Sequence, residues 1–452
     1  MLSQNDLLKR LNKMVGEQHV VVDGGVNASA VDGMVPRAVV FPGSVEEVAM
    51  VLAFASVEGL RVSPRGGGTK VMLGRAPDAV DVVLCLKRLN RLVDHEPADM
   101  TATFQAGITL LEAQTVLKDA GQFIALDSPF ADTATLGGIL AANSSGPLRY
   151  RYGSARDLLI AVRAVLVDGS IIKGGAKVVK SVSGYDMNKL FIGSLGTLGV
   201  IVEATFRLYP IPRVEKTQLI PCASADDASM LVAGVLDSTL APSMVELFCP
   251  VAANRVVQQT GHSWPDGQFG LAVAFGSVSS DAVDAQLQQL KRDVHRRQVQ
   301  EGTTLDEERH CSFWASARGF AMGDQRRVVL KASVLLTKVG EAVKLGQTIA
   351  SRMGLDLAMV SEAGSGIVRY QFVQRAGEEE SYRQGISEAV VQLRDFAQAG
   401  GGSLVVLEAP PEMKSALDVW GPVGTALPLM KRLKDQFDPK RILNPGRFVG
   451  GI

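Results

Sequence analysis

The stretch Val62-Ser63-Pro64-Arg65-Gly66-Gly67-Gly68-Thr69-Lys70 places three consecutive glycines after an apolar run and between two basic side chains. Glycine has no Cβ, so a backbone of this composition can approach a ligand closely and adopt positive φ angles. Successive N–H groups in such a turn can form an anion-binding nest, and Arg65 and Lys70 add positive charge beside it. The stretch therefore indicates either a pocket for a phosphate or pyrophosphate or a flexible surface turn.

Two common nucleotide-binding motifs do not fit this stretch. A Rossmann fingerprint needs Gly-x-Gly-x-x-Gly ahead of a helix, but Val71 stands at the last of these positions and the next expected element is a strand at residues 81–86. A Walker A loop needs Gly-Lys followed by Ser or Thr, whereas Thr69 precedes Lys70 here. A phosphate pocket at this point would belong to a different fold.

The residues before the glycines form a strand–helix–strand pattern. An apolar strand at residues 38–42 is followed by a capping-box pattern at Ser44, which predicts a helix that ends near Gly59. A second strand at residues 60–63 leads directly into the glycines. This order predicts an α/β unit with the glycine turn at the end of a strand.

A second stretch rich in small residues runs from Asp132 to Gly146. Thr133, Thr135 and the N–H groups of Gly137-Gly138 could bind an anion at the start of a helix. The alternative is a close-packed helix in which glycine and alanine only permit intimate contact. Both interpretations remain open from the residues alone.

The composition excludes some classes of function. The 452 residues contain 47 Lys and Arg against 47 Asp and Glu, so the net charge is zero and a broad nucleic-acid surface is not expected. Apolar residues make up 46% and charged residues 21%, which is typical of a globular protein. The N-terminus reads as an amphipathic helix without the apolar core of a signal peptide. No apolar run is long enough to span a membrane, so we expect a cytoplasmic protein.

The four cysteines are Cys85, Cys222, Cys249 and Cys311. None forms a Cys-x-x-Cys motif, so neither zinc nor iron–sulfur ligation is expected within this chain. Their scatter fits free thiols in a reducing compartment.

The residue pattern changes after residue 212: glycine clusters become rare, and the stretches with helical periodicity become longer. Strands and helices alternate from there to about residue 410. This alternation predicts an antiparallel sheet covered by helices on one face, in a ferredoxin-like α+β arrangement.

Six short motifs occur in order along the chain: Pro64-Arg65-Gly66-Gly67-Gly68-Thr69, Thr135-Leu136-Gly137-Gly138, Gly153-Ser154-Ala155-Arg156-Asp157, Gly184-Tyr185-Asp186, the run from Gly193 to Gly199, and Asn444-Pro445-Gly446-Arg447. Together they resemble the FAD-binding oxidoreductases of the vanillyl-alcohol oxidase / p-cresol methylhydroxylase (PCMH) type. Within that superfamily, Ser145-Gly146-Pro147, Val178-Val179-Lys180 and Trp420-Gly421-Pro422 are most similar to the FAD-binding E subunit of glycolate oxidase (glycolate dehydrogenase).

The resemblance implies an α+β fold with a PCMH-type two-lobed FAD-binding domain, a ferredoxin-like α+β cap domain and a C-terminal tail that returns to the FAD domain. The expected boundaries are a helical segment at residues 1–34, the FAD domain at 35–212, the cap at 213–415, and a C-terminal helix and tail at 416–452.

The resemblance also implies which residues hold FAD. These are Arg65, Gly66, Gly67, Gly68, Thr69, Lys70, Thr133, Thr135, Gly137, Gly138, Asn143, Ser154, Gly199, Val200, Ile201 and Arg447. Some relatives tether the flavin covalently through a histidine in the first loop. Thr69 stands at that place here, and no cysteine lies between Cys85 and Cys222, so we expect non-covalent FAD.

The catalytic groups of related subunits are not evident in this chain. Those subunits carry a Gly-Asp-Gly-Asn-Leu-His segment and a Glu-His pair in the cap, which hold a metal or accept the hydroxyl proton. None of the five histidines, His19, His95, His262, His295 and His310, stands in such a motif, and no metal is expected. The segment from Arg309 to Arg318 resembles a cap segment whose arginine binds the substrate carboxylate, which makes Arg318 and His310 the candidate substrate contacts. The alternative places Trp314 in the core and Arg318 in an ion pair.

Two functions remain open. In the first, the chain is the FAD-dependent subunit of a glycolate or 2-hydroxyacid dehydrogenase complex: flavin N5 accepts hydride from the hydroxyacid carbon, and electrons pass to a partner. In the second, it is an FAD-binding electron-transfer or assembly subunit with no substrate oxidation of its own. A sister flavoprotein subunit and an iron–sulfur subunit are the expected partners, through which the complex could associate with the inner face of the membrane. A nucleotide-binding protein without redox chemistry is the third reading.

Overall fold

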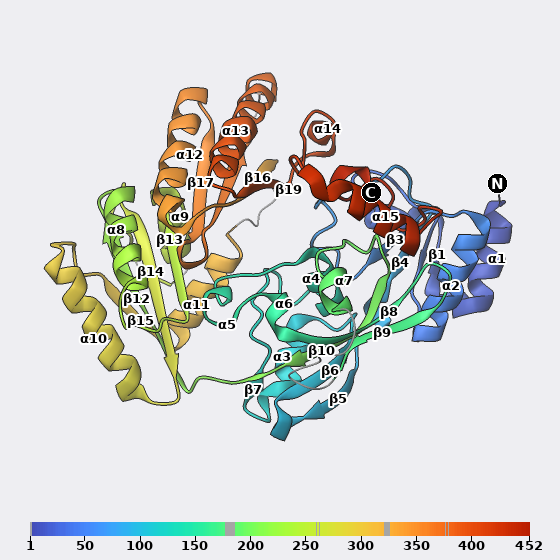
Figure 1. Cartoon of the computed structure of the whole chain (residues 1–452), viewed down its shortest axis with the longest axis horizontal. Coiled ribbons are helices and arrows are strands. Elements are labelled where there is room, and N and C mark those ends of the chain that lie inside the picture. Colours follow the sequence, from blue (N-terminus) through green and yellow to red (C-terminus); the bar gives the residue numbers. More distant parts are fainter. Residues whose placement is uncertain are drawn as a thin grey trace. The chain divides into compact units, whose positions relative to one another are not determined.

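The computed structural model describes residues 2–176, 186–258, 260–261, 263–320, 326–375, 377 and 379–452. The chain divides into two compact units (Figure 1). The first comprises Met1–Ser145, Ser154–Ile211 and Pro422–Ile452, and the second comprises Gly146–Gly153 and Pro212–Gly421. His262, Gly184-Tyr185 and Val178-Val179-Lys180, which the sequence singled out, lie outside the described residues.

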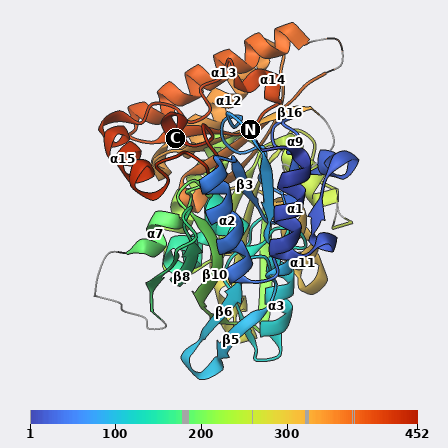
Figure 2. The same ribbon diagram turned by 90° about the vertical axis from the view of Figure 1, so that its right-hand side faces the viewer.

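The first unit begins with a small sheet in the order β1-β2-β4-β3. Strands β2 (Ala38–Val40), β4 (Val82–Cys85) and β3 (Val62–Arg65) are parallel, and β1 (Val20–Val21) is antiparallel at the edge. Helices α1 (Gln4–Val15) and α2 (Val45–Glu58) lie side by side in this unit (Figure 2). Their apolar faces share one buried cluster with the strands. This packing fixes the end of β3, where the glycine stretch begins.

The start and end of α2 follow from two residues. The Ser44 hydroxyl accepts a hydrogen bond from the Glu47 backbone N–H at 3.1 Å, which satisfies one of the free donors of the first turn. Gly59 takes the left-handed conformation (φ 69°) that ends the helix. The predicted helix from Ser44 to Gly59 is therefore confirmed.

The second sheet of this unit is antiparallel, in the order β5-β6-β10-β8-β9. Its strands are β5 (Leu92–Glu96), β6 (Thr101–Gln105), β8 (Leu159–Val165), β9 (Ile171–Gly175) and β10 (Val200–Arg207). A hairpin turn at Asp168-Gly169 joins β8 to β9, and Gly169 has a φ of 87°. The other elements are α3 (Leu110–Lys118), α4 (Leu136–Ala142), α6 (Ala155–Leu158), α7 (Met187–Phe191) and the short pair β7 (Gln122–Phe123) and β11 (Tyr209–Pro210).

The C-terminal tail returns to the first unit, as predicted. Helix α15 (Leu427–Phe437) leads into a segment that runs parallel to the start of β3. The Val62 N–H donates to the Ile442 carbonyl at 2.8 Å, and the Asn444 N–H donates to the Val62 carbonyl at 3.0 Å. The tail thus borders the strand that carries the glycine stretch.

The second unit contains an eight-stranded antiparallel sheet in the order β15-β12-β14-β13-β17-β18-β16-β19. The strands are β12 (Val214–Cys222), β13 (Met244–Phe248), β14 (Phe269–Ser277), β15 (Thr303–Asp306), β16 (Arg327–Ser333), β17 (Asp356–Glu362), β18 (Ile367–Val373) and β19 (Ser403–Glu408). Its core is one continuous buried cluster.

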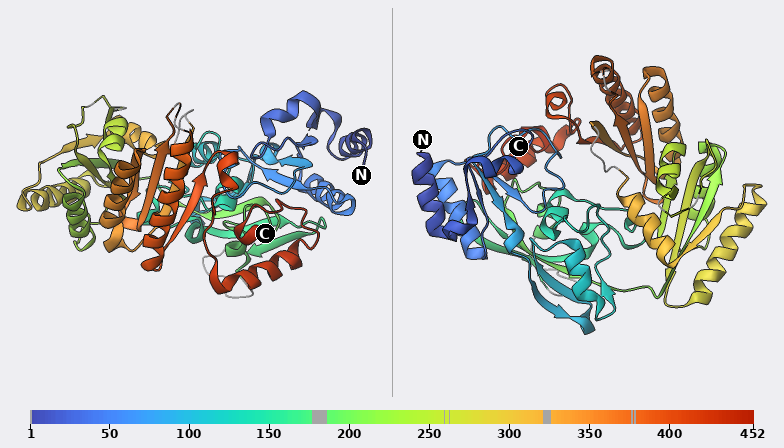
Figure 3. Two further views of the ribbon diagram at one scale, coloured as in Figure 1. Left: turned by 90° about the horizontal axis from the view of Figure 1, so that it is seen from above. Right: turned by 180° about the vertical axis from the view of Figure 1, so that it is seen from behind.

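Helices cover the two faces of this sheet unequally (Figures 1 and 3). One face carries α8 (Ala225–Leu236), α10 (Ser280–Arg296), α12 (Val339–Met353) and α13 (Glu379–Ala399). The other face carries α9 (Pro250–Gln258), which contacts β13, β14 and β17, and α11 (Glu307–Arg318), which contacts β12 and β15. The short α5 (Arg149–Tyr152) contacts β13 on this face. The expectation of helices on one face is thus incomplete, because α9 and α11 bury the apolar side chains that β12, β13 and β14 present on the second face. A further short helix is α14 (Pro411–Lys414).

Candidate functional site

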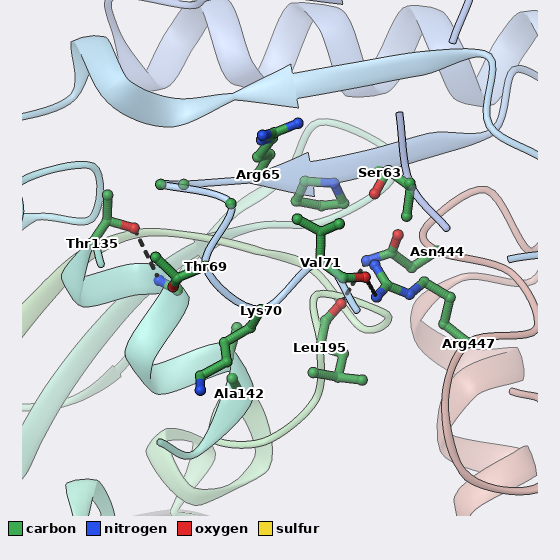
Figure 4. Close-up of a pocket in the computed structure, with 17 residues that line it drawn as sticks. Ser63, Arg65, Thr69, Lys70, Val71, Thr135, Ala142, Leu195, Asn444 and Arg447 are labelled. Atoms are coloured by element: carbon green, nitrogen blue, oxygen red, sulfur yellow. Dashed lines mark hydrogen bonds between the residues drawn. The ribbon is translucent and has the colours of Figure 1, made fainter. Parts of the chain in front are cut away.

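A pocket in the first unit surrounds the glycine stretch (Figure 4). Strand β3, the loop that follows it, helix α4 and the C-terminal tail supply its walls. The lining residues are Val31, Ser63, Pro64, Arg65, Gly66, Gly67, Gly68, Thr69, Lys70, Val71, Thr135, Gly138, Ala141, Ala142, Leu195, Asn444 and Arg447. A second pocket shares part of this wall and extends to Gly137, Gly196, Gly199, Val200 and Ile201.

Thirteen of the sixteen predicted FAD-binding residues line these two pockets. The other three are Thr133, Asn143 and Ser154. Thr133 lies directly behind Gly67, Asn143 ends α4 in the left-handed conformation, and Ser154 caps α6 through Asp157. The structure brings the two glycine-rich stretches together, and contact of each residue with FAD stays a prediction.

The glycines are required because the two stretches interlock. A Cβ on Gly66 would lie 2.0 Å from the Thr135 hydroxyl oxygen, and a Cβ on Gly67 would lie 1.8 Å from the Thr133 carbonyl oxygen. Gly68 has a φ of 84°, which strains any residue with a side chain. Only a run of glycines can therefore follow this path against the second stretch.

Thr135 fixes the second wall. Its hydroxyl accepts a hydrogen bond from the Gly138 N–H at 3.3 Å, and the side chain is only 2% exposed. This N-cap holds the first turn of α4 against the glycine loop.

The charged residues that line the first pocket are all cations: Arg65, Lys70 and Arg447. The Arg65 guanidinium donates to the Ala28 carbonyl at 3.3 Å, and the Arg447 guanidinium donates to the Val71 and Leu73 carbonyls at 2.6 Å each. Burial lowers the pKa of Arg447. A pocket with cations and glycine N–H groups in its lining fits the dianionic pyrophosphate of FAD.

The predicted binding residues did not include two neighbouring residues of the pocket wall, Asn444 and Leu195. The Asn444 side-chain amide donates to the Leu195 carbonyl at 2.6 Å, and its Oδ1 is buried without a hydrogen-bond partner among the described residues. Both residues belong to motifs that the sequence showed, Asn444-Pro445-Gly446-Arg447 and Gly193 to Gly199. Their spacing could have indicated them, but no sequence signal pointed to Val31.

A buried ion pair ties the tail to the pocket wall. Lys434 and Asp438 are both 0% exposed, and their side chains meet at 2.7 Å. The Lys434 ammonium also donates to the Thr197 and Leu443 carbonyls at 2.8 and 3.0 Å. The Asp438 carboxylate accepts from the N–H groups of Ile442 and Leu443. One lysine therefore joins the loop at residue 197 to the tail.

In the second unit, the candidate contact His310 is 4% exposed and lies in the core. Its Nδ1 is 2.9 Å from the Thr217 hydroxyl, which accepts a hydrogen bond from the Trp314 indole N–H at 2.8 Å. Burial, and next the charge of Arg318, lower the pKa of His310 to about 4. Trp314 is a core residue, with 0% exposure.

The Arg318 side chain lies near the side chains of His310 and Glu215. Burial raises the pKa of Glu215, and the charge of Arg318 opposes that shift. The Arg318 Nε is buried without a hydrogen-bond partner in the part of the chain that the structure describes. Substrate contact by Arg318 or His310 stays a prediction.

A cluster of charges that the sequence did not single out lies on β16, β17 and β18. Lys331 and Arg369 face each other across β16 and β18, and Arg369 forms an ion pair with the buried Glu362. Burial is the largest cause that lowers the pKa of Lys331, to about 8; the charges of Arg369 and Arg149 lower it further, and Glu362 opposes them. We call Arg149, Lys331, Glu362 and Arg369 the cationic cluster.

A short sequence motif indicates one member of this cluster, Arg369. Gly364-Ser365-Gly366-Ile367-Val368-Arg369 has the glycine spacing of the Gly-Asp-Gly-Asn-Leu-His segment expected in related subunits, with Arg369 at the place of the histidine.

Two protein-family models match the chain. The model described as the FAD binding domain matches residues 36–175, and the model described as FAD linked oxidases, C-terminal domain, matches residues 211–406 and 413–448. No helix in the described residues is long and apolar enough to cross a membrane.

Three relatives of known name match over about nine-tenths of their own length. D-lactate dehydrogenase of Archaeoglobus fulgidus is 30% identical over 91% of this chain and 91% of its own length. Glycolate oxidase subunit GlcD of Bacillus subtilis is 26% identical over 91% of this chain and 89% of its own length. D-2-hydroxyglutarate dehydrogenase of Stutzerimonas stutzeri is 23% identical over 91% of each.

Solved structures match the fold. p-Cresol methylhydroxylase with substrate bound has a TM-score of 0.76 at 15% identity and covers 98% of this chain and 96% of its own. Alkyldihydroxyacetonephosphate synthase has a TM-score of 0.73 at 17% identity, over 98% of this chain and 85% of its own. The predicted fold class is confirmed.

Proposed function

Because the chain belongs to the FAD-linked oxidases, we propose that it oxidises a small 2-hydroxy carboxylic acid as the FAD-dependent subunit of a glycolate-type dehydrogenase complex. The observation that carries the substrate class is the cationic cluster of the second unit. The relatives named above, whose names refer to glycolate, D-lactate and D-2-hydroxyglutarate, support the same class.

The cluster suits a carboxylate because one of its cations is uncommitted. Arg369 is paired with Glu362, but the Lys331 ammonium has no hydrogen bond or ion pair with another residue that the structure describes. With Lys331 protonated, the cationic cluster contains three cations and one carboxylate. A substrate carboxylate would meet this excess with charge-assisted hydrogen bonds.

The first unit supplies the cofactor site. FAD held there would supply two-electron redox chemistry: the hydroxyacid would lose a hydride to the flavin and its hydroxyl proton to solvent, and would leave as the 2-oxoacid. The glycine loop and Thr135 would hold the pyrophosphate through N–H groups and the hydroxyl. Lys70 would balance its charge.

We also propose that FAD binds without a covalent bond. Thr69 cannot form the flavin linkage that a histidine forms at this place in some relatives. Acid precipitation should therefore release all the flavin into the supernatant. Flavin fluorescence that stays with the precipitated polypeptide would contradict this.

The test of the main proposal is anaerobic reduction of the purified holoprotein. Glycolate, D-lactate and D-2-hydroxyglutarate are mixed separately with the protein while the visible flavin absorption is followed. Bleaching by at least one acid, with a rate that saturates, is expected. Lys331→Met should raise the half-saturating concentration about tenfold or more, because the carboxylate loses a charged partner.

The alternative function is an FAD-binding electron-transfer or assembly subunit. The replacement of the expected histidine by Arg369 favours it, because no described histidine lies at the cationic cluster to accept the hydroxyl proton. A holoprotein that no hydroxyacid bleaches, but that restores activity to a sister flavoprotein and an iron–sulfur subunit, would establish the alternative. Co-purification of those two subunits with a tagged chain is expected under either function.

A further inference from the structure

The charged face of the second unit is built by strand register. Val360 pairs with Arg369, and Glu362 pairs with Ile367, so Glu362 and Arg369 project from the same face of the β17–β18 hairpin. Lys331 pairs with Arg369 on the other side. Tyr370, next in sequence to Arg369, points the opposite way and donates its hydroxyl to the Ala342 carbonyl of α12. The cationic cluster therefore lies on the sheet face that α12 does not cover.

The ion pair within the cluster is buried. Glu362 is 2% exposed, and the Arg369 side chain is 21% exposed. A carboxylate buried this deeply needs a permanent cation beside it, because an uncompensated buried charge is strongly destabilising. Arg369 supplies that cation and remains charged at every pH at which the protein is folded.

This set of side chains does not fit a divalent metal. Metal centres need neutral imidazole, thiolate or carboxylate ligands. Here a guanidinium stands where related subunits have the histidine, and Lys331 and Arg149 add further positive charge. Glu362 is already paired with Arg369, and the other buried carboxylate on this face is Glu246 of the neighbouring strand β13. Among the described residues, no group of three or more His, Cys, Asp and Glu side chains could hold a metal ion.

We propose that the Glu362–Arg369 ion pair replaces a metal centre, so that this chain binds the carboxylate of its ligand through its own cations and independently of metal. Arg369 and Lys331 form the anion site, and Glu362 keeps the guanidinium in place. The proposal rests on the proposed function for the class of anion, but its test does not need turnover.

The probe is oxalate, a planar dicarboxylate, added to the holoprotein while the flavin spectrum and the melting temperature are recorded. Metal content is measured on the same sample by mass spectrometry. We expect substoichiometric metal, saturable oxalate binding, and the same oxalate dissociation constant with and without EDTA.

The variant that tests the pair is Glu362→Met with Arg369→Met. Removing both members of the pair leaves neither Glu362 nor Arg369 as a buried charge without its partner, so the fold should survive. Oxalate binding should weaken about tenfold or more, and Lys331→Met should weaken it similarly. The matched control is Arg163→Met with Glu203→Met, which removes a cross-strand arginine–glutamate pair of the first unit whose charged atoms are 3.0 Å apart. That control should bind oxalate as the wild type does.

A metal ion that co-purifies at one per chain, or oxalate binding that EDTA abolishes, would overturn the inference. So would a wild-type protein that does not bind oxalate, or a double variant that binds it unchanged. Failure of the proposed function has a different signature. In that case oxalate binds independently of metal, but no hydroxyacid bleaches the flavin.

Discussion

Gly67 shows how the absence of one side chain decides the shape of the pocket. The position of its missing Cβ lies 1.8 Å from the Thr133 carbonyl oxygen, a backbone atom that cannot rotate away. The glycine therefore permits the two pocket walls to touch. Its role is steric, and it is set by a residue 66 positions further along the chain.

Gly67→Ala should separate the walls and weaken FAD binding about tenfold or more, with a loss of stability of about 1–3 kcal/mol from overpacking. Fluorescence titration of the apoprotein with FAD measures the dissociation constant. The control is Gly24→Ala, because a Cβ there meets no atom within 4 Å. Wild-type affinity in Gly67→Ala would contradict the steric argument.

His310 makes stability depend on pH. Its folded-state pKa is about 4, against 6.5 for an ordinary histidine. Between these values the unfolded chain binds a proton at His310 that the folded chain does not, so the free energy of unfolding falls as the pH drops from 6.5 to 4. The loss should reach about 3 kcal/mol.

Urea unfolding at several pH values between 7 and 4 measures this loss. His310→Gln should flatten the profile by about 3 kcal/mol over the same interval. His295→Gln, at an exposed position of α10, is the control and should leave it unchanged. A profile of His310→Gln that parallels the wild type would show that His310 is not the group responsible.

At the residue scale, the sequence identified the glycine loop and most of the pocket lining, because short motifs carry their chemistry locally. It missed the cationic cluster, since Lys331 and Arg369 meet only through the pairing of β16 with β18. The glycine spacing before Arg369 could have indicated that residue, but its contact with Lys331 depends on strand register, which no local pattern contains. The sequence also presented His310 as a candidate substrate contact, whereas tertiary packing buries the ring beside Trp314.

Among the helices, local sequence rules predict the ends correctly where capping residues determine them. Ser44 and Gly59 bound α2 as expected, and Thr109 with Glu112 forms the capping box that starts α3. Helix α15 is different. Its amphipathic pattern suggests that a lysine on it would be solvated, yet Lys434 is 0% exposed because three oxygen acceptors surround its ammonium.

Lys434→Met should release the tail from the pocket wall. It leaves Asp438 buried without its cation, which typically costs about 3–5 kcal/mol. FAD affinity should fall together with stability, and hydrogen exchange at residues 442–447 should accelerate more than exchange in α2. Lys431→Met, at an exposed position of the same helix, should change neither quantity. Uniform acceleration of both segments would show general destabilisation only.

In the molecule as a whole, the change in residue pattern after residue 212 coincides with the start of the long segment of the second unit, Pro212–Gly421. The assignment of Gly146–Gly153 to that unit was beyond sequence reasoning. It follows from distant contacts, such as the hydrogen bond from the Arg151 guanidinium to the Ala241 carbonyl at 2.9 Å and the place of Tyr150 against Gly364. The family resemblance supplied the architecture, whereas composition alone indicated only a globular chain.

The dependence of the first unit on the last residues is testable by truncation. Deletion of residues 442–452 removes Asn444 and Arg447 from the pocket and the strand partner of Val62. FAD binding should be lost, while most of the far-ultraviolet circular dichroism remains because the second unit is intact. A truncated protein that still binds FAD at wild-type affinity would contradict this.

The pairing of Arg447 with the Val71 carbonyl spans 376 residues, and this has a consequence for biosynthesis. A ribosome that adds about 5–20 residues per second needs about 20–75 seconds to travel from one to the other. During that time the glycine loop exists as nascent chain without the tail that completes its pocket. We therefore expect the cofactor to load after synthesis of the tail and not before it, so that flavin incorporation would report that translation has reached the tail.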